Sequence, residues 1–124
     1  MAYSDVKMSQ GDIYTIDVIL WDTAQKVSIV KDSIVLNAVA TYSTVSHENA
    51  AKYCDISLIN RDAVVMQRFF YKEFTGSQDW KLIELPAMKK LKLNAGDILR
   101  FIAYSDAGSP DHTFLNARIT LMEV

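Results

Sequence analysis

Apolar and polar side chains alternate residue by residue over much of this chain, and this pattern limits the possible folds more than any other feature. A period of two places successive side chains on opposite faces of a β-strand. The alternation is clearest at 115–122 and recurs at 14–20, 34–42, 56–58 and 98–104. In the run at 115–122, the apolar face consists of Leu115, Ala117, Ile119 and Leu121. The chain is therefore predicted to be built from strands.

Short polar segments that favour turns separate these runs, at 60–62, 75–79, 94–97 and 105–110. Helix is expected only at 46–52, as one or two turns that begin at Ser46 as the N-cap. About eight short strands at close spacing predict an all-β fold, an antiparallel β-sandwich of the jelly-roll type.

The length of 124 residues suits one domain that buries its own core. We expect an N-terminal arm at 1–13 and a single sandwich domain at 14–124. The net charge of −2 comes without a basic stripe, which argues against nucleic acid as the partner. No apolar run approaches the ~20 residues that span a bilayer, so no membrane partner is expected. Residues 1–11 lack the apolar core of a secretory signal, which predicts synthesis in a cytoplasm.

Several strands carry apolar residues on both faces, more than a two-layer sandwich needs. Ile19 and Trp21 lie on the otherwise polar side of the first strand. In the next long strand, Val35 and Val39 are expected opposite the face formed by Ile34, Leu36, Ala38, Ala40 and Tyr42. The segment 64–71 is almost continuously apolar and includes Phe69 and Tyr71. These extra residues either cover neighbouring loops or contact another subunit.

Two further aromatic residues flank the predicted loop at 75–79. Phe74 precedes this loop and Trp80 follows it. An aromatic side chain on a loop can stack on a sugar or anchor a protein contact. It can equally close the open end of the sandwich. The candidate partner-contact residues are Ile19, Trp21, Phe69, Tyr71, Phe74 and Trp80.

Catalytic motifs are not found in the sequence, and we expect no enzymatic activity. No G-x-S-x-G motif occurs, and His47 and His112 are the two imidazoles. A metal site of Asp106, Asp111 and His112 is conceivable by ligand type, but its spacing matches no known binding loop, so no metal or other cofactor is predicted. The single cysteine, Cys54, is expected to fill the core or its rim.

Two arginines, Arg68 and Arg100, interrupt strand interiors. One interpretation is that they reach solvent on the exposed face of a sheet. The other is that they pair with a carboxylate across a subunit boundary.

The order of these segments resembles the jelly-roll or sandwich domains of tailed-phage virion proteins. The resemblance rests on "LKLNAGDILRFIAYSDAGSPDHTFLNARITLMEV" at 91–124, and on "SIVLNAVATYSTVS" at 33–46 followed by "YCDISLINRD". Such domains occur as capsid decoration proteins, head fibres and baseplate or tail accessory modules. Carbohydrate-binding modules and tumour-necrosis-factor-like trimers share the general layout.

The resemblance implies a non-enzymatic structural protein of a bacteriophage virion. We expect a capsid decoration or auxiliary protein that self-associates and binds other virion proteins through apolar sheet surface and the N-terminal arm. The alternative is a carbohydrate-binding module, or a tail or baseplate accessory domain, whose loop aromatics bind a glycan.

Overall fold

The computed structural model describes residues 11–106 and 108–124. In these residues the chain forms nine strands and one short 3-10 helix, η1, at Pro86–Met88. The strands are β1 (Ile13–Trp21), β2 (Ala24–Ser28), β3 (Ser33–Val45), β4 (Lys52–Ile59), β5 (Val65–Glu73), β6 (Gln78–Glu84), β7 (Lys92–Leu93), β8 (Ile98–Ser105) and β9 (His112–Glu123). No helix in the described part of the chain has the length and apolarity needed to cross a membrane.

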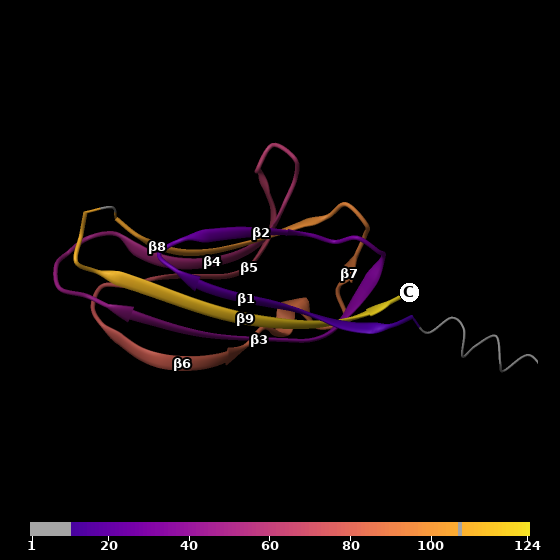
Figure 1. The fold of residues 1–124 in the computed structure, drawn as a ribbon, viewed down its shortest axis with the longest axis horizontal. Coiled ribbons are helices and arrows are strands. Elements are labelled where there is room, and N and C mark those ends of the chain that lie inside the picture. Colours follow the sequence, from indigo (N-terminus) through magenta and orange to yellow (C-terminus); the bar gives the residue numbers. More distant parts are fainter. Residues whose placement is uncertain (1–10, 107) are drawn as a thin grey trace, which may run out of the picture.

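The strands form two sheets, which Figure 1 shows as two stacked layers. Sheet A has the order β1-β9-β3-β6, with β7 paired to β3, and sheet B has the order β2-β8-β4-β5. Pairing is antiparallel throughout and nested: β1 with β9, β2 with β8, β3 with β6 and β4 with β5. This is one long hairpin rolled over on itself, which is the jelly-roll arrangement. The predicted all-β antiparallel sandwich of jelly-roll type is confirmed.

The core lies between the two sheets and follows the predicted alternation closely. Leu115, Ile119 and Leu121 of β9 are fully buried, and so are Leu99 and Phe101 of β8. The side chains between them face outward, because neighbouring residues in a strand point to opposite faces. The fold of the core is therefore set by period-two patterning in the central strands.

A β-bulge in β3 changes the face assignment that we expected for that strand. Its pairing with β9 shifts between Val35 and Asn37, so Leu36 is an extra residue. Val35 is consequently fully buried, whereas Ile34 and Leu36 are only half-buried. The prediction that Ile34 and Leu36 share the core face with Ala38, and that Val35 lies opposite, was wrong for this reason.

Two bulges in β5 explain its nearly continuous apolar sequence. The register with β4 shifts between Ile56 and Ser57 and again between Leu58 and Ile59. Phe69 is the extra residue at the first shift, so Phe69 and Phe70 both pack against the core although they are neighbours in sequence. The bulges also bend the strand, and the β4–β5 hairpin projects away from the sandwich (Figure 1).

Two other expectations concern chain segments rather than single strands. The predicted helical turn at 46–52 is not helical: its last residue, Lys52, is buried and begins β4. Residues 1–10 of the predicted arm lie outside the described residues. The rest of that segment already belongs to sheet A, since Gly11 donates a backbone hydrogen bond to Glu123 and Ile13 begins β1.

Candidate functional site: the outer face of sheet A

The outer face of sheet A exposes large apolar side chains that no element of the described chain covers. Ile19 is 80% exposed, Leu82 67%, Trp21 63% and Trp80 56%. Ile19 and Trp21 belong to the edge strand β1, and Trp80 and Leu82 belong to the opposite edge strand β6. Scattered exposed apolar residues are ordinary, but a group of large ones on one sheet face is typical of a contact surface.

Aromatic rings gather at one end of this face. Phe114 of β9 lies between the two tryptophans, with ring centroids 5.7 Å from Trp21 and 5.8 Å from Trp80. His112 stands edge-on to Trp21 at 5.6 Å. Such tilted and edge-on contacts are the favoured arrangements for aromatic pairs. They hold the exposed rings in place, so the surface is organised before any partner binds.

A shallow groove of about 360 Å³ crosses the middle of the same face. Ile19 and Leu82 line it from the two edge strands, and Thr41 and Asn116 line it from the central strands. The Asp17–Arg118 ion pair, with 2.7 Å between Arg118 Nε and the carboxylate, lies beside it. The groove thus combines apolar side chains with a few polar groups that can orient a bound segment.

Asp22 anchors the aromatic end of the face. It has a positive φ of 53°, and its carboxylate accepts a hydrogen bond of 2.7 Å from the Thr113 backbone N–H. The second carboxylate oxygen lies 2.7 Å from His112 Nδ1, whereas Trp21 Nε1 lies 3.3 Å from that nitrogen. Both contacts cannot be full hydrogen bonds at once, because Trp21 Nε1 only donates. The shorter distance places the proton on His112 Nδ1, which donates to Asp22.

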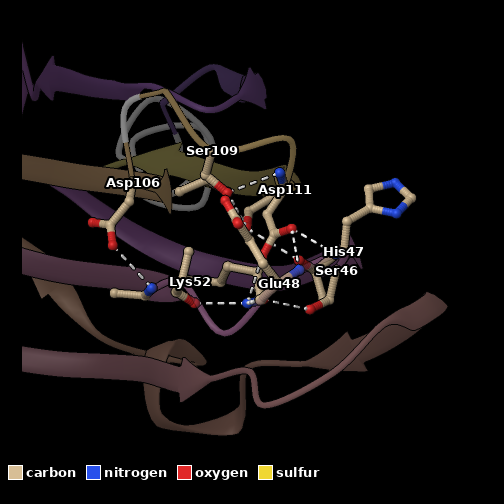
Figure 2. Close-up of polar contacts among 12 residues, drawn as sticks. Ser46, His47, Glu48, Lys52, Asp106, Ser109 and Asp111 are labelled. Carbon is tan, nitrogen blue, oxygen red and sulfur yellow. Dashed lines mark hydrogen bonds and ion pairs between the residues drawn. The ribbon is translucent and has the colours of Figure 1, made fainter.

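A buried polar cluster fixes the loops at one end of the sandwich (Figure 2). Lys52 Nζ donates to Asp111 at 2.8 Å and to the carbonyls of Ala50 and Glu48 at 2.6 and 3.3 Å. The other oxygen of Asp111 accepts the backbone N–H groups of His47 and Glu48 at 2.5 and 3.1 Å. All three protons of the ammonium group thereby have acceptors.

This environment determines the charge of Asp111. Burial favours the neutral acid and raises its pKa. The hydrogen bonds from Lys52, His47 and Glu48 and the charge of Lys52 outweigh burial and lower the pKa to about 2. Asp111 is therefore a carboxylate at neutral pH. Since its oxygens already bind Lys52 and two backbone groups, the cluster is a structural clamp between the 46–51 and 106–111 loops.

The structure brings three of the six predicted contact residues together, namely Ile19, Trp21 and Trp80. Tyr71 is exposed on the outer face of sheet B, where its ring packs 5.6 Å from that of Tyr53. Phe69 is half-buried against the core. Its inward position results from the bulge in β5, where Phe69 is the extra residue, and not from the regular alternation of the strand.

Phe74 requires a correction. It is only 7% exposed, and its ring centroid lies 5.5 Å from that of Tyr42 in the core. Its backbone N–H pairs with the Lys52 carbonyl, which continues the sheet past the end of β5 and keeps the side chain inside. Phe74 therefore belongs to the core and cannot form a surface platform with Trp80.

Leu82 and Phe114 also lie on this face and were not predicted from the sequence. Leu82 is two residues from Trp80 and Phe114 is two residues from Asn116, so each has the outward parity of its strand. That parity was a usable signal for both. The signal was obscured in β6, because the residue between Trp80 and Leu82 is the exposed Lys81 and not an apolar core residue.

The three side chains that were conceivable metal ligands by type, Asp106, Asp111 and His112, each have another partner. Asp106 accepts hydrogen bonds from Tyr104 and from the Ala51 backbone, Asp111 binds Lys52, and His112 binds Asp22. In the described ranges, no group of three or more His, Cys, Asp or Glu side chains is arranged to hold a metal ion.

No family model matches this chain, and no curated protein matches it. Among solved structures, it is similar to that of infectious bursal disease virus Gx strain over 90% of this chain and 31% of that chain, with 9% identity and a TM-score of 0.36. The similarity to the VP2 subviral particle of the same virus covers 90% of this chain and 32% of that chain, with 9% identity and a TM-score of 0.36. The similarity to Desmodium yellow mottle tymovirus covers 91% of this chain and 83% of that chain, with 10% identity and a TM-score of 0.38. The chain spans about a third of the two bursal disease virus chains.

Proposed function

We propose that this chain is a non-enzymatic virion structural protein of a bacteriophage. It binds the assembled particle as a capsid decoration or auxiliary protein, through the outer face of sheet A. The observation that carries the proposal is the group of exposed apolar residues on that face, namely Ile19, Trp21, Trp80 and Leu82. The chain is made in the host cytoplasm and works on the virion.

Burial of this face by a partner supplies the binding energy. A fully buried large apolar side chain contributes about 1.5–3 kcal/mol before the costs of association. Trp21 and Trp80 serve as anchors, because tryptophan is enriched among the residues that dominate interface energies. The groove between Ile19 and Leu82 accepts an apolar segment of the partner, and Asn116 and Thr41 supply hydrogen-bonding groups.

The edge strand β1 supports self-association next to this face. It pairs with β9 over nine residues without a register shift, and it contains no Pro, Lys or Arg. By contrast, β2 is short and carries Lys26, and the pairing of β5 is interrupted by two bulges. Lysines, bulges and shortness are the devices that protect free sheet edges from pairing. In this proposal β1 is the edge open to another copy, and the rest of the predicted arm, residues 1–10, orders against that neighbour.

Binding to particles that lack this protein tests the proposal. The double variant Ile19→Ser/Leu82→Ser should co-sediment with such particles at least tenfold less than wild type. The matched control is Val64→Ser/Met66→Ser, which removes two exposed apolar residues of the β4–β5 hairpin and should bind as wild type. Circular dichroism verifies that both variants are folded. Equal binding by the Ile19/Leu82 variant and wild type would overturn the proposal.

Glycan binding is the second candidate, and the exposed rings of Trp21 and Trp80 on either side of Phe114 favour it. A group of neighbouring aromatic rings on one sheet face suits the apolar face of a sugar. A glycan array with wild type and Trp80→Ala separates the two functions. A signal that Trp80→Ala loses would support the glycan module, and absence of any signal would count against it.

A further inference from the structure

A row of basic side chains crosses the outer face of sheet B. Lys26 of β2 pairs in register with Arg100 of β8, and Arg100 pairs with Ser57 of β4. Ser57 in turn pairs with Arg68 of β5. All four face outward, because their strand neighbours Val27, Leu99, Ile56 and Phe69 pack in or against the core. The sheet thus carries three cationic side chains in one row across all four of its strands.

Arg68 is neutralised within the chain. Its Nε lies 3.0 Å from the Asp55 carboxylate, and its guanidinium lies 4.8 Å from the centre of the Tyr71 ring. Asp55 is buried and also accepts a hydrogen bond from the Ser57 hydroxyl. Arg68 reaches solvent on the exposed face of a sheet, as the first of the two expectations has it, and its carboxylate partner lies in the same chain and not across a subunit boundary.

Arg100 and Lys26 lack such a partner. Neither forms an ion pair with any residue in the part of the chain that the structure describes. The Nε of Arg100 is sealed from solvent and has no hydrogen-bond acceptor. A buried donor without an acceptor is costly, and like charges directly opposite in neighbouring strands destabilise a sheet. The isolated domain therefore carries an unfavourable pair that an anion would relieve.

We propose that the outer face of sheet B binds an acidic side chain of a partner protein, whose carboxylate lies between Arg100 and Lys26. The planar guanidinium of arginine matches the geometry of a carboxylate, and lysine adds a second charge. Ile98 and Ile102, both half-buried, flank Arg100 along β8 on the same face. An arginine framed by apolar side chains is typical of the centre of a protein interface.

The surroundings of Arg100 favour a protein carboxylate over inorganic phosphate, because Ile98 and Ile102 flank it with apolar surface that a protein partner can cover. Lys26, Arg68 and Arg100 contribute three positive charges and Asp55 one negative charge, so this group of four has a net charge of +2. Asp55 already occupies Arg68 and repels a second anion. The site lies on the opposite sheet from the proposed particle-binding face, so either proposal can fail without the other.

An NMR titration tests the site. The probes are sodium glutarate, as a small carboxylate, and inorganic phosphate, both at constant ionic strength maintained with sodium chloride. In the wild-type protein, glutarate should give saturable shifts of the backbone amides of Lys26, Ser57 and Arg100. Arg100→Gln should weaken this binding by roughly tenfold or more, since a charge-assisted hydrogen bond is lost. The matched control Arg61→Gln, which removes an exposed arginine at the tip of the β4–β5 hairpin, should titrate as wild type.

Thermal unfolding separates a binding role from a structural role. If the role of Arg100 is to bind an external carboxylate, Arg100→Gln should keep or raise the Tm of the isolated protein. Glutarate should raise the Tm of wild type and should not raise the Tm of this variant. A lower Tm for Arg100→Gln, glutarate shifts that this variant retains, or shifts that chloride alone reproduces would overturn the proposal. Saturable binding of phosphate with no response to glutarate would overturn the choice of a carboxylate.

Discussion

The Lys52 ammonium group and the Asp111 carboxylate lie 2.8 Å apart with both side chains completely buried. Lys52 begins β4 and Asp111 lies in the loop before β9, at the same end of the sandwich (Figure 2). Together with the backbone groups of His47 and Glu48, they form a network in which each strong donor or acceptor is satisfied. A charge pair of this kind fixes loop geometry, because removing either partner leaves the other charge buried alone.

Replacing Lys52 with methionine should therefore destabilise the protein strongly. The variant leaves the Asp111 carboxylate without its cation, and we expect the Tm to fall on the order of 10 °C. Thermal unfolding followed by circular dichroism measures the change. The control is Lys31→Met, which breaks the exposed Lys31–Glu123 pair of 3.1 Å and should shift the Tm by less than about 2 °C. Equal shifts in the two variants would contradict the assignment of Lys52–Asp111 as a clamp.

The lowered pKa of Asp111 predicts how stability depends on acid. The pKa is about 2 in the folded protein and about 3.9 in an unfolded chain. The contribution of Asp111 is therefore complete above about pH 4 and is lost as the pH falls toward 2. In Lys52→Met/Asp111→Leu, which removes both charges, the free energy of unfolding should decline less between pH 4 and pH 2 than in wild type. Urea unfolding at a series of pH values measures this, and parallel declines would refute the prediction.

The sequence predicts the layered β fold because period-two patterning is strong where both neighbours in the sheet are paired. It is clearest in the central strands β8 and β9, whose inward residues are almost all fully buried. The edge strand β2 was not predicted, since Val27 is its only residue that packs against the core. A strand that buries one side chain leaves too weak a pattern to recognise.

Bulges account for most of what the sequence did not reveal. In β3, apolar residues occupy both parities around Leu36, so the pattern before and after the bulge looks continuous. The same holds for Phe69 in β5. A bulge is set by pairing with a strand distant in sequence, and local alternation does not contain that information. Ile19 and Trp21 could be assigned to the outer face because β1 has no bulge with β9.

The opposite positions of Phe74 and Trp80 predict opposite mutational effects. Phe74→Ala should lower the free energy of unfolding by about 3 kcal/mol, because a buried ring is removed from beside Tyr42. Trp80→Ala should change it by less than about 1 kcal/mol, since that ring is mostly exposed. Urea unfolding of the two variants provides the comparison. A larger loss for Trp80→Ala would place its ring in the core and contradict the assignment of the outer face.

The position of Cys54 predicts an unreactive thiol in the native state. Cys54 is fully buried, and burial, aided by the charge of Asp55, raises its pKa to about 12. The nucleophilic thiolate is therefore almost absent at pH 8, and a reagent can reach the thiol only when the two sheets separate. A disulfide reagent such as 5,5′-dithiobis(2-nitrobenzoate) should modify native protein at least a hundredfold more slowly than protein in about 6 M guanidinium chloride. Cys54→Ala/Thr75→Cys, with its thiol on an exposed turn, provides the fast-reacting control. Equal rates for native wild type and this control would show that the interface between the sheets is open to solvent at Cys54.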